Sequence, residues 1–189
     1  LTLIVALQTV PAIGTRDFWL HDEVRHADVL RHAYETGQYT VLSLNGVPYP
    51  DKPPLYFLLL GGLKALTQAS DAVVVQLGSA LAGLLLAWAV YALARVGAGL
   101  SREGGLAAGL AIAATPLFAV LTRTTRMDAL FAACVTASQA ALFAGWQRPA
   151  ASRWVVLGLG LAALACLVKG PFGLALPLAT SPAYLAWVG

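Results

Sequence analysis

Long uncharged stretches alternate with short charged ones along the whole chain. A helix that crosses a bilayer needs about 20 apolar residues, with a usable range of about 17–25. The uncharged runs therefore predict spanning helices at residues 1–15, 72–94, 104–122, 129–147, 154–168 and 170–189. Run 154–168 is at the short limit, where Arg153 and Lys169 can extend to the two interfaces. Thr115-Pro116 and Pro177 lie inside runs, so we expect kinks there.

The first run is interpreted as a truncated spanning helix rather than as the core of a signal peptide. Residues 1–15 are uncharged, but no basic segment precedes them, as a signal peptide requires. The chain begins with Leu1 rather than Met, and its last run reaches the end without a polar tail. We therefore expect the chain to be a single domain that is one part of a longer membrane protein.

Residues 54–70 form an apolar segment that is too short to cross. Only 11 residues separate Lys52 from Lys64, so we expect a helix that lies in the membrane interface or packs on the bundle. If that helix does not cross the membrane, one membrane face holds three charged elements. They are the loop 16–53, the segment 123–128 and Lys169.

The opposite loops set the expected orientation. They carry four Arg and one Glu, which are Arg95, Arg102, Glu103, Arg148 and Arg153. Short loops rich in Arg are typical of a cytoplasmic side. The face that holds the loop 16–53 is therefore expected to be extracytoplasmic.

Composition places these helices in a membrane protein. Of the 189 residues, 59% are hydrophobic and 11% are charged, against about 45–50% and about 25% in soluble domains. This balance excludes a soluble enzyme and a disordered tail. The net charge of +3 includes no run of Lys or Arg, so nucleic acid is not an expected partner. The sequence predicts an all-α integral membrane fold, a polytopic helix bundle whose extracytoplasmic first loop carries short juxtamembrane helices.

The first loop begins with a predicted short helix. Asp22 is expected to be its N-cap and Gly37 its stop, and apolar residues recur between them at Ala27, Leu30 and Tyr34. Asp22 and Glu23 then lie at the start of the helix, where the helix dipole favours a carboxylate. The pair either caps a surface helix or supplies charge to a functional site.

Cysteine and histidine residues do not form a recognisable metal motif. Cys134 and Cys166 lie in apolar runs and are expected to pack as small hydrophobic residues. His21 and His26 are five residues apart, whereas the zinc-protease motif needs a spacing of four. We therefore expect both to be solvated loop histidines.

A turn and a proline pair complete the first loop. Asn45-Gly46 between two short apolar stretches predicts a β-hairpin. Farther on, two prolines follow Lys52, stiffen the backbone and hold the ammonium at the membrane surface. A fixed cation beside the carboxylate of Asp51 suits a phosphate group. The plainer interpretation is an interfacial lysine before a proline that starts a helix.

Two further charged segments lie between uncharged runs. A charge costs about 2.5–3.5 kcal/mol at the bilayer centre on the insertion scale, so these groups are expected at the surface or paired inside the bundle. Together with the first loop, they predict a cationic pocket with carboxylates at the depth of the lipid headgroups. Such a pocket fits an anionic lipid substrate and acid–base chemistry. Its expected members are Lys52, Arg126, Lys169, Asp22, Glu23, Asp51 and Asp128.

Four motifs, in this order and spacing, resemble those of the GT-C superfamily of lipid-dependent glycosyltransferases. They are Asp22-Glu23, Tyr49-Pro50-Asp51-Lys52-Pro53-Pro54, Arg126-Met127-Asp128 and Lys169-Gly170-Pro171. The branch that the chain looks most like contains the lipid A aminoarabinose transferases and the bacterial relatives of protein O-mannosyltransferases. Members of that branch are much longer, so the chain resembles the N-terminal part of their plan.

The resemblance implies that a sugar moves, with inversion, from a polyprenyl phosphate to a glycolipid, protein or cell-envelope acceptor. The reaction would take place on the extracytoplasmic face of a bacterial plasma membrane, whose lipids are also partners. Asp22 would be the general base for the acceptor hydroxyl, and Lys52 would be the second catalytic residue. Arg126 and Lys169 would bind the donor phosphate. The supporting residues, or the ligands of a divalent metal ion, would be Glu23, Asp51 and Asp128.

Two other classes of protein stay open. An ion-coupled transporter would use the charged residues as an ion path, but transporters place ionisable groups near the midplane and often show repeated halves. Here the charges lie at the ends of runs. The third class is a membrane assembly subunit that kept the fold without catalysis, against which the presence of Asp22 and Lys52 argues.

Overall fold

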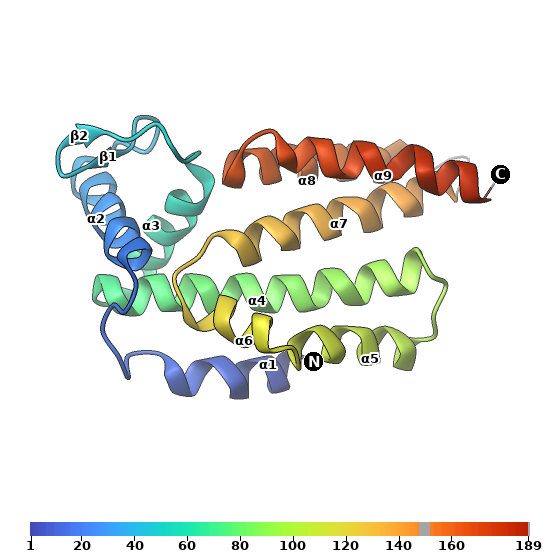
Figure 1. The fold of residues 1–189 in the computed structure, drawn as a ribbon, viewed down its shortest axis with the longest axis horizontal. Coiled ribbons are helices and arrows are strands. Elements are labelled where there is room, and N and C mark those ends of the chain that lie inside the picture. Colours follow the sequence, from blue (N-terminus) through green and yellow to red (C-terminus); the bar gives the residue numbers. More distant parts are fainter. Residues whose placement is uncertain (148–151, 189) are drawn as a thin grey trace.

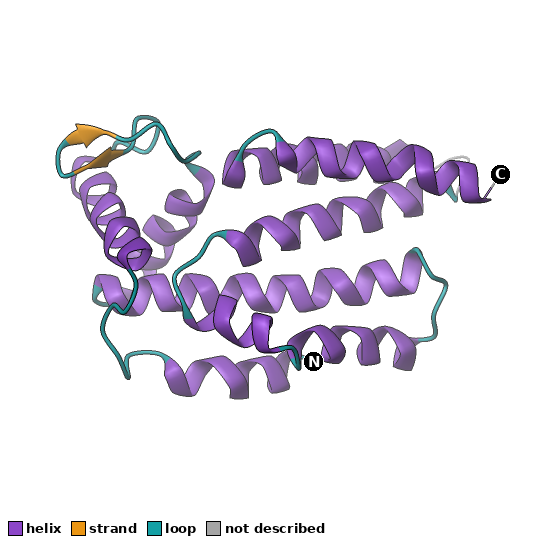
Figure 2. Cartoon of the chain, viewed as in Figure 1, coloured by secondary structure: helices purple, strands orange, loops and turns teal. Residues whose placement is uncertain are grey.

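The computed structural model describes residues 1–147 and 152–188, and helices make up nearly all of it. Most helices run along one long axis, whereas α2, α3 and a β-hairpin gather at one end (Figure 1, Figure 2). The expected all-α fold is confirmed. In chain order the elements are α1 (Thr2–Thr9), the 3-10 helix η1 (Val10–Ala12), α2 (His21–Thr36), β1 (Ser43–Leu44), β2 (Val47–Pro48), α3 (Leu55–Thr67), α4 (Asp71–Val96), α5 (Arg102–Ala113), α6 (Pro116–Arg123), α7 (Asp128–Trp146), α8 (Ser152–Lys169) and α9 (Phe172–Val188).

Helices α4 and α7 form the centre of the bundle. They pack against each other, with α5 beside α4 and α8 beside α7. Small residues let the helices approach closely; a Cβ at Gly83, for example, would overlap Thr122 of α6. Both central helices are long and apolar enough to cross a membrane, at 26 and 19 residues. Cys134 of α7 and Cys166 of α8 are unbridged and partly buried, as expected for packed cysteines.

A candidate third crossing consists of two helices with a sharp bend between them. Helices α5 and α6 are long and apolar enough only when taken together, and they are bent by 68°. The hydroxyl of Thr115 accepts a hydrogen bond from the N–H of Phe118 at 3.2 Å, and Pro116 begins α6. The predicted run 104–122 is therefore broken at Thr115-Pro116, where the kink was expected.

The other apolar helices are shorter than the central pair. Thr2–Ala12 and Phe172–Ala183 are apolar helices of less than 18 residues, Pro177 lies inside α9, and α8 has 18 residues. The membrane limits of these segments stay predictions. Residue 189, at the end of the last predicted run, and Arg148, predicted on the opposite face, lie outside the described residues.

The helix expected in the first loop is α2, but it starts earlier than predicted. Leu20, in an extended conformation, is the N-cap residue. The prediction of Asp22 as the N-cap is therefore wrong, and Asp22 lies within the first turn instead. The reason is Glu23, which reaches back to the N–H groups of Trp19 and Leu20 at 2.8 and 3.2 Å and so fixes the start of the helix. Gly37 stops the helix with a φ of 70°, as expected.

The predicted hairpin is confirmed. Strands β1 and β2 pair in antiparallel fashion, with Leu44 opposite Val47. Asn45 and Gly46 have φ angles of 51° and 77°, and two left-handed residues are what a type I′ turn requires.

Helix α3 is the short apolar helix expected over residues 54–70. It packs against α2, α4 and α8, and Tyr56, Phe57 and Leu60 on it are fully buried. At the end of α3, Lys64 donates hydrogen bonds to the carbonyl oxygen of Ala69 at 2.9 Å and to Asp71 at 2.7 Å. These bonds close the corner between α3 and α4, so α3 packs on the bundle, one of the two placements expected for it.

Candidate active site

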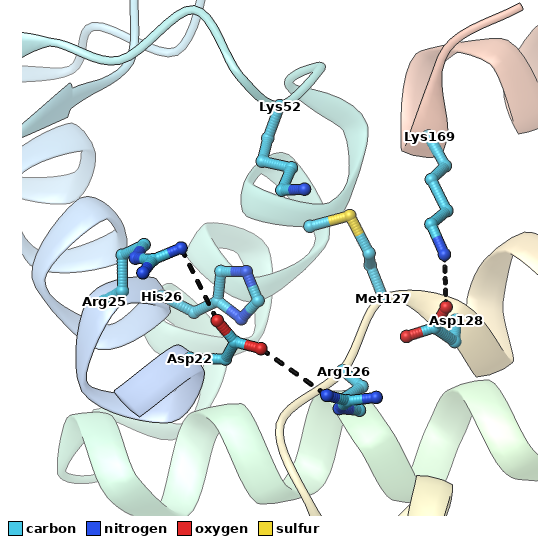
Figure 3. A pocket seen from close by; sticks show the side chains of 8 residues that line it. All are labelled: Asp22, Arg25, His26, Lys52, Arg126, Met127, Asp128 and Lys169. Atoms are coloured by element: carbon cyan, nitrogen blue, oxygen red, sulfur yellow. Dashed lines mark hydrogen bonds and ion pairs between the residues drawn. The ribbon is translucent and has the colours of Figure 1, made fainter. Parts of the chain in front are cut away.

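One pocket at the end of the bundle gathers charged side chains from distant parts of the sequence. It has a volume of about 240 Å³ and is formed by α2, the loop before α3, the start of α7 with its preceding loop, and the end of α8 (Figure 3). These segments meet because α3 packs beside the bundle while α4, α7 and α8 run back and forth along its length (Figure 1). The residues that line the pocket are Asp22, Arg25, His26, Lys52, Arg126, Met127, Asp128 and Lys169.

The pocket contains five of the seven residues that the sequence singled out. They are Asp22, Lys52, Arg126, Asp128 and Lys169. The other two lie outside its lining, since Glu23 is buried and Asp51 is exposed. Three lining residues were missed, namely Arg25, His26 and Met127.

Helical spacing was the signal that could have found two of the missed residues. Arg25 and His26 follow Asp22 by three and four residues, which puts them on the same face of α2. The interpretation of His26 as a solvated loop histidine is wrong. This side chain is 5% exposed, and its ring packs edge-on against Tyr56 and Phe57, with centroids 5.8 and 5.7 Å apart.

Positive charge exceeds negative charge in the pocket. Asp22 lies between two guanidinium groups, with Arg25 and Arg126 each 3.5 Å from one of its oxygens, and Asp128 pairs with Lys169. Lys52 extends into the pocket from the loop before α3 (Figure 3), and within the part of the chain that the structure describes no hydrogen bond or ion pair engages its ammonium. The lining therefore offers four cations against two carboxylates, which favours an anionic ligand.

The ring of His26 binds the loop before α7. Its Nδ1 lies 3.3 Å from the carbonyl oxygen of Thr125, and because a carbonyl can only accept, Nδ1 carries the proton. Burial is the largest influence and lowers the pKa of His26, outweighing the carbonyl of Thr125 and the charge of Asp22, which raise it. Since the ordinary value is 6.5, the ring is neutral at pH 7.

Glu23 ties the first loop to the loop before α7. It is 1% exposed, Arg16 donates to its two oxygens at 3.0 and 2.7 Å, and the N–H of Thr125 donates to it at 2.9 Å. Burial would raise the pKa of Glu23, but these hydrogen bonds and two from the backbone before α2 lower it to about 2. Thr125 is thus held at its N–H by Glu23 and at its carbonyl by His26, and the next residue is Arg126.

The metal site that the resemblance implies has no matching donor set among the described residues. In residues 1–147 and 152–188, no group of three His, Cys, Asp or Glu side chains lies close enough to hold a metal ion. Glu23 and Asp128 are already paired with Arg16 and Lys169, and Asp51 lies outside the pocket. The divalent metal ion stays a prediction, and the arrangement of these three side chains does not fit a site for it.

Fold and site together define a multi-pass helical membrane protein with a positively charged pocket at one end of its bundle. The relation to known proteins is specific. The chain belongs to the dolichyl-phosphate-mannose-protein mannosyltransferase family, which it matches over residues 51–189.

Curated relatives support this membership. The undecaprenyl phosphate-alpha-4-amino-4-deoxy-L-arabinose arabinosyl transferase 2 of Proteus mirabilis (strain HI4320) is 26% identical over 182 residues, which are 94% of this chain and 32% of that protein. The corresponding transferase of Shewanella sediminis (strain HAW-EB3) is 26% identical over 179 residues, which are 93% of this chain and 32% of that protein.

Solved structures show the same fold. The crystal structure of ArnT from Cupriavidus metallidurans in the apo state matches with a TM-score of 0.86 and 26% identity, over 98% of this chain and 35% of that one. The structure of the same protein bound to undecaprenyl phosphate matches with a TM-score of 0.77 and 26% identity, over 92% of this chain and 32% of that one. The chain therefore spans about a third of the length of these relatives.

Proposed function

We propose that the chain is the N-terminal part of a membrane glycosyltransferase of the bacterial plasma membrane. The enzyme moves a sugar from a polyprenyl phosphate to an acceptor on the extracytoplasmic face and inverts the configuration at the anomeric carbon. The observation that carries the proposal is the pocket itself, in which four cations and a carboxylate at the start of α2 meet at one end of the bundle. The names of the relatives support undecaprenyl phosphate as the lipid and a 4-amino-4-deoxypentose as the sugar.

The reaction explains why cations dominate the pocket. An acceptor oxygen attacks the anomeric carbon on the side opposite the phosphate, and the bond from that carbon to the phosphate oxygen breaks. The electron pair leaves with the polyprenyl phosphate, whose phosphate gains one negative charge. Fixed positive charges that face the departing oxygen stabilise that transition state. Lys52, Arg126 and Lys169 supply them.

Asp22 is the candidate base. It takes the proton from the acceptor hydroxyl as the new bond forms, which leaves the product neutral at that oxygen. Its place in the first turn of α2, with ion pairs to Arg25 and Arg126, holds the carboxylate next to the phosphate-binding side chains. The base and the phosphate site therefore lie within one pocket.

The depth of the pocket suits a lipid phosphate. Its residues lie at the ends of apolar helices and in the connecting loops, where a headgroup phosphate lies when its chain is in the bilayer. A transporter would instead need ionisable groups along the crossing helices. In the crossings α4 and α7, the described charged side chains are confined to the helix ends.

Transfer of labelled 4-amino-4-deoxyarabinose from undecaprenyl phosphate to lipid A, by the full-length protein in proteoliposomes, tests the proposal. We expect Asp22→Asn and Lys52→Ala each to reduce the turnover rate by about a hundredfold or more. Asp17→Asn and Arg102→Ala are matched controls, because both side chains are exposed and lie outside the pocket.

Two results would contradict this assignment. Undiminished transfer by Asp22→Asn would show that Asp22 is not the base. A wild-type protein that binds no undecaprenyl phosphate and transfers no sugar would refute the proposed function as a whole.

A further inference from the structure

Within residues 1–147 and 152–188, His26 contacts a protein hydrogen-bond partner through one of its two ring nitrogens, Nδ1. The ring lies one turn after Asp22 on α2, is 5% exposed and lines the pocket. Figure 3 shows it between Asp22 and Lys52, at the centre of the group of charged side chains. Its edge-on contacts with Tyr56 and Phe57 fix the plane of the ring.

The chemistry of each nitrogen follows from the partner of Nδ1. Because Nδ1 donates to the carbonyl of Thr125 and the ring is neutral, Nε2 carries no proton and has a free lone pair. In the part of the chain that the structure describes, no donor engages Nε2. The ring therefore presents to the pocket a hydrogen-bond acceptor that none of these residues engages.

The other polar side chains of the pocket have different partners or roles. The Arg and Lys side chains only donate, Asp22 is assigned to the hydroxyl of the acceptor, and Asp128 pairs with Lys169. A sugar, however, brings several hydroxyl groups, each of which must donate a hydrogen bond once it leaves water. His26 Nε2 is the uncharged acceptor that the described lining offers to such a hydroxyl.

We propose that His26 is a positioning residue for the sugar, whose Nδ1–H fixes the loop that carries Arg126 while Nε2 accepts a hydrogen bond from a hydroxyl of the transferred sugar. This inference rests on the proposed function and adds a determinant of substrate choice to it. A donor sugar without that hydroxyl leaves Nε2 unpaired and is rejected. The phosphate and lipid of the donor are indifferent to Nε2, because they offer it no proton.

Three substitutions separate the two nitrogens. His26→Asn keeps an N–H near the position of Nδ1 and removes the Nε2 acceptor. His26→Gln carries its amide farther out and restores an acceptor near Nε2. His26→Phe keeps the ring and removes both polar atoms. Each variant is made in the full-length protein and is measured for binding of undecaprenyl phosphate alone and for transfer of the aminoarabinose.

We expect His26→Asn to bind undecaprenyl phosphate like the wild type but to lose about tenfold to a hundredfold in kcat/KM for transfer. His26→Phe weakens both lipid binding and transfer, because the loop that carries Arg126 loses one of the two hydrogen bonds that hold Thr125. His26→Gln transfers faster than His26→Phe. Donors that each lack one ring hydroxyl identify the hydroxyl that contacts Nε2. We expect one of these donors to be a poor substrate of the wild type. For that donor, the kcat/KM of His26→Asn should equal that of the wild type, because the contact is absent in both cases.

The outcomes separate this inference from the function on which it rests. Normal transfer by His26→Asn, or equal losses of lipid binding and transfer in His26→Asn and His26→Phe, would overturn the role of Nε2 while the wild-type activity stands. Discrimination among the deoxy donors that is identical in the wild type and in His26→Asn would do the same. Absence of transfer by the wild type would overturn the proposed function, and this inference with it.

Discussion

Replacing Glu23 with Gln should destabilise the protein by an amount that the structure allows us to work out. The carboxylate is buried and accepts hydrogen bonds from Arg16 and from three backbone N–H groups, including that of Thr125. A Gln has the same shape but carries no charge. Its amide nitrogen, which is itself a donor, faces the donors from which the second carboxylate oxygen accepted hydrogen bonds. Among the described residues, the partly buried guanidinium of Arg16 then keeps no anionic partner.

The size of the effect follows from the lowered pKa. The pKa of Glu23 falls from an ordinary value of 4.5 to about 2 in the folded protein, and each unit corresponds to about 1.4 kcal/mol. The ionised carboxylate therefore stabilises the fold by about 3 kcal/mol at neutral pH. This agrees with the cost of about 3–5 kcal/mol for removing one partner of a buried ion pair.

The sign of the pH dependence is fixed by the direction of the shift. Because the folded-state pKa is lowered, the stabilisation is fully present above pH 4.5 and is lost as the pH falls towards 2. We expect the thermal midpoint of Glu23→Gln, measured in detergent, to lie several degrees below that of the wild type at pH 7. The two midpoints should converge near pH 2.

Asp17→Asn is the control, since Asp17 is exposed in the same loop. Equal midpoints of Glu23→Gln and wild type at pH 7, or a difference between them that does not shrink on acidification, would refute this account of Glu23.

Two further predictions concern packing and topology. Gly173→Ala should lower the thermal midpoint of unfolding, because the added Cβ would meet the backbone of Cys166 on α8, at a cost of about 1–3 kcal/mol. Gly160→Ala is the control and should leave the midpoint unchanged, because no atom lies near the added Cβ. Equal effects of the two substitutions would contradict the close contact at Gly173. Cysteines placed at Asn45 and Leu100, in a background without native cysteines, should react with impermeant reagents from opposite sides of the membrane. Labelling of both from one side would overturn the topology.

Much of the fold could be predicted because the bilayer leaves few choices to an apolar helix. Charged residues bound the apolar runs, so the ends of α4 and α7 fall close to the predicted limits. The break at Thr115-Pro116 was visible because proline cannot continue the hydrogen bonds of a helix. The start of α2 was missed because Glu23, and not Asp22, fixes it through contacts with the residues before the helix.

The members of the site were harder to predict than its location. Asp22 and Glu23 are neighbours in sequence, but successive residues of a helix are turned by about 100°, so Asp22 faces the pocket and Glu23 faces Arg16 and Thr125. Asp51 lies outside the pocket although the next residue, Lys52, lines it. A motif of adjacent residues shows that a segment reaches the site, whereas the backbone conformation decides which side chain faces it.

The two prolines after Lys52 affect the thermodynamics of binding without touching the ligand. Their rings fix φ near −65°, so the backbone next to Lys52 is already ordered in the folded protein. Its conformational entropy is lost when the protein folds and not when a phosphate binds. Only the four-carbon side chain is then left to be ordered, at a cost of about 0.5–1.5 kcal/mol. The affinity of the pocket for an anion is therefore set in part by Pro53 and Pro54, neither of which lines the pocket.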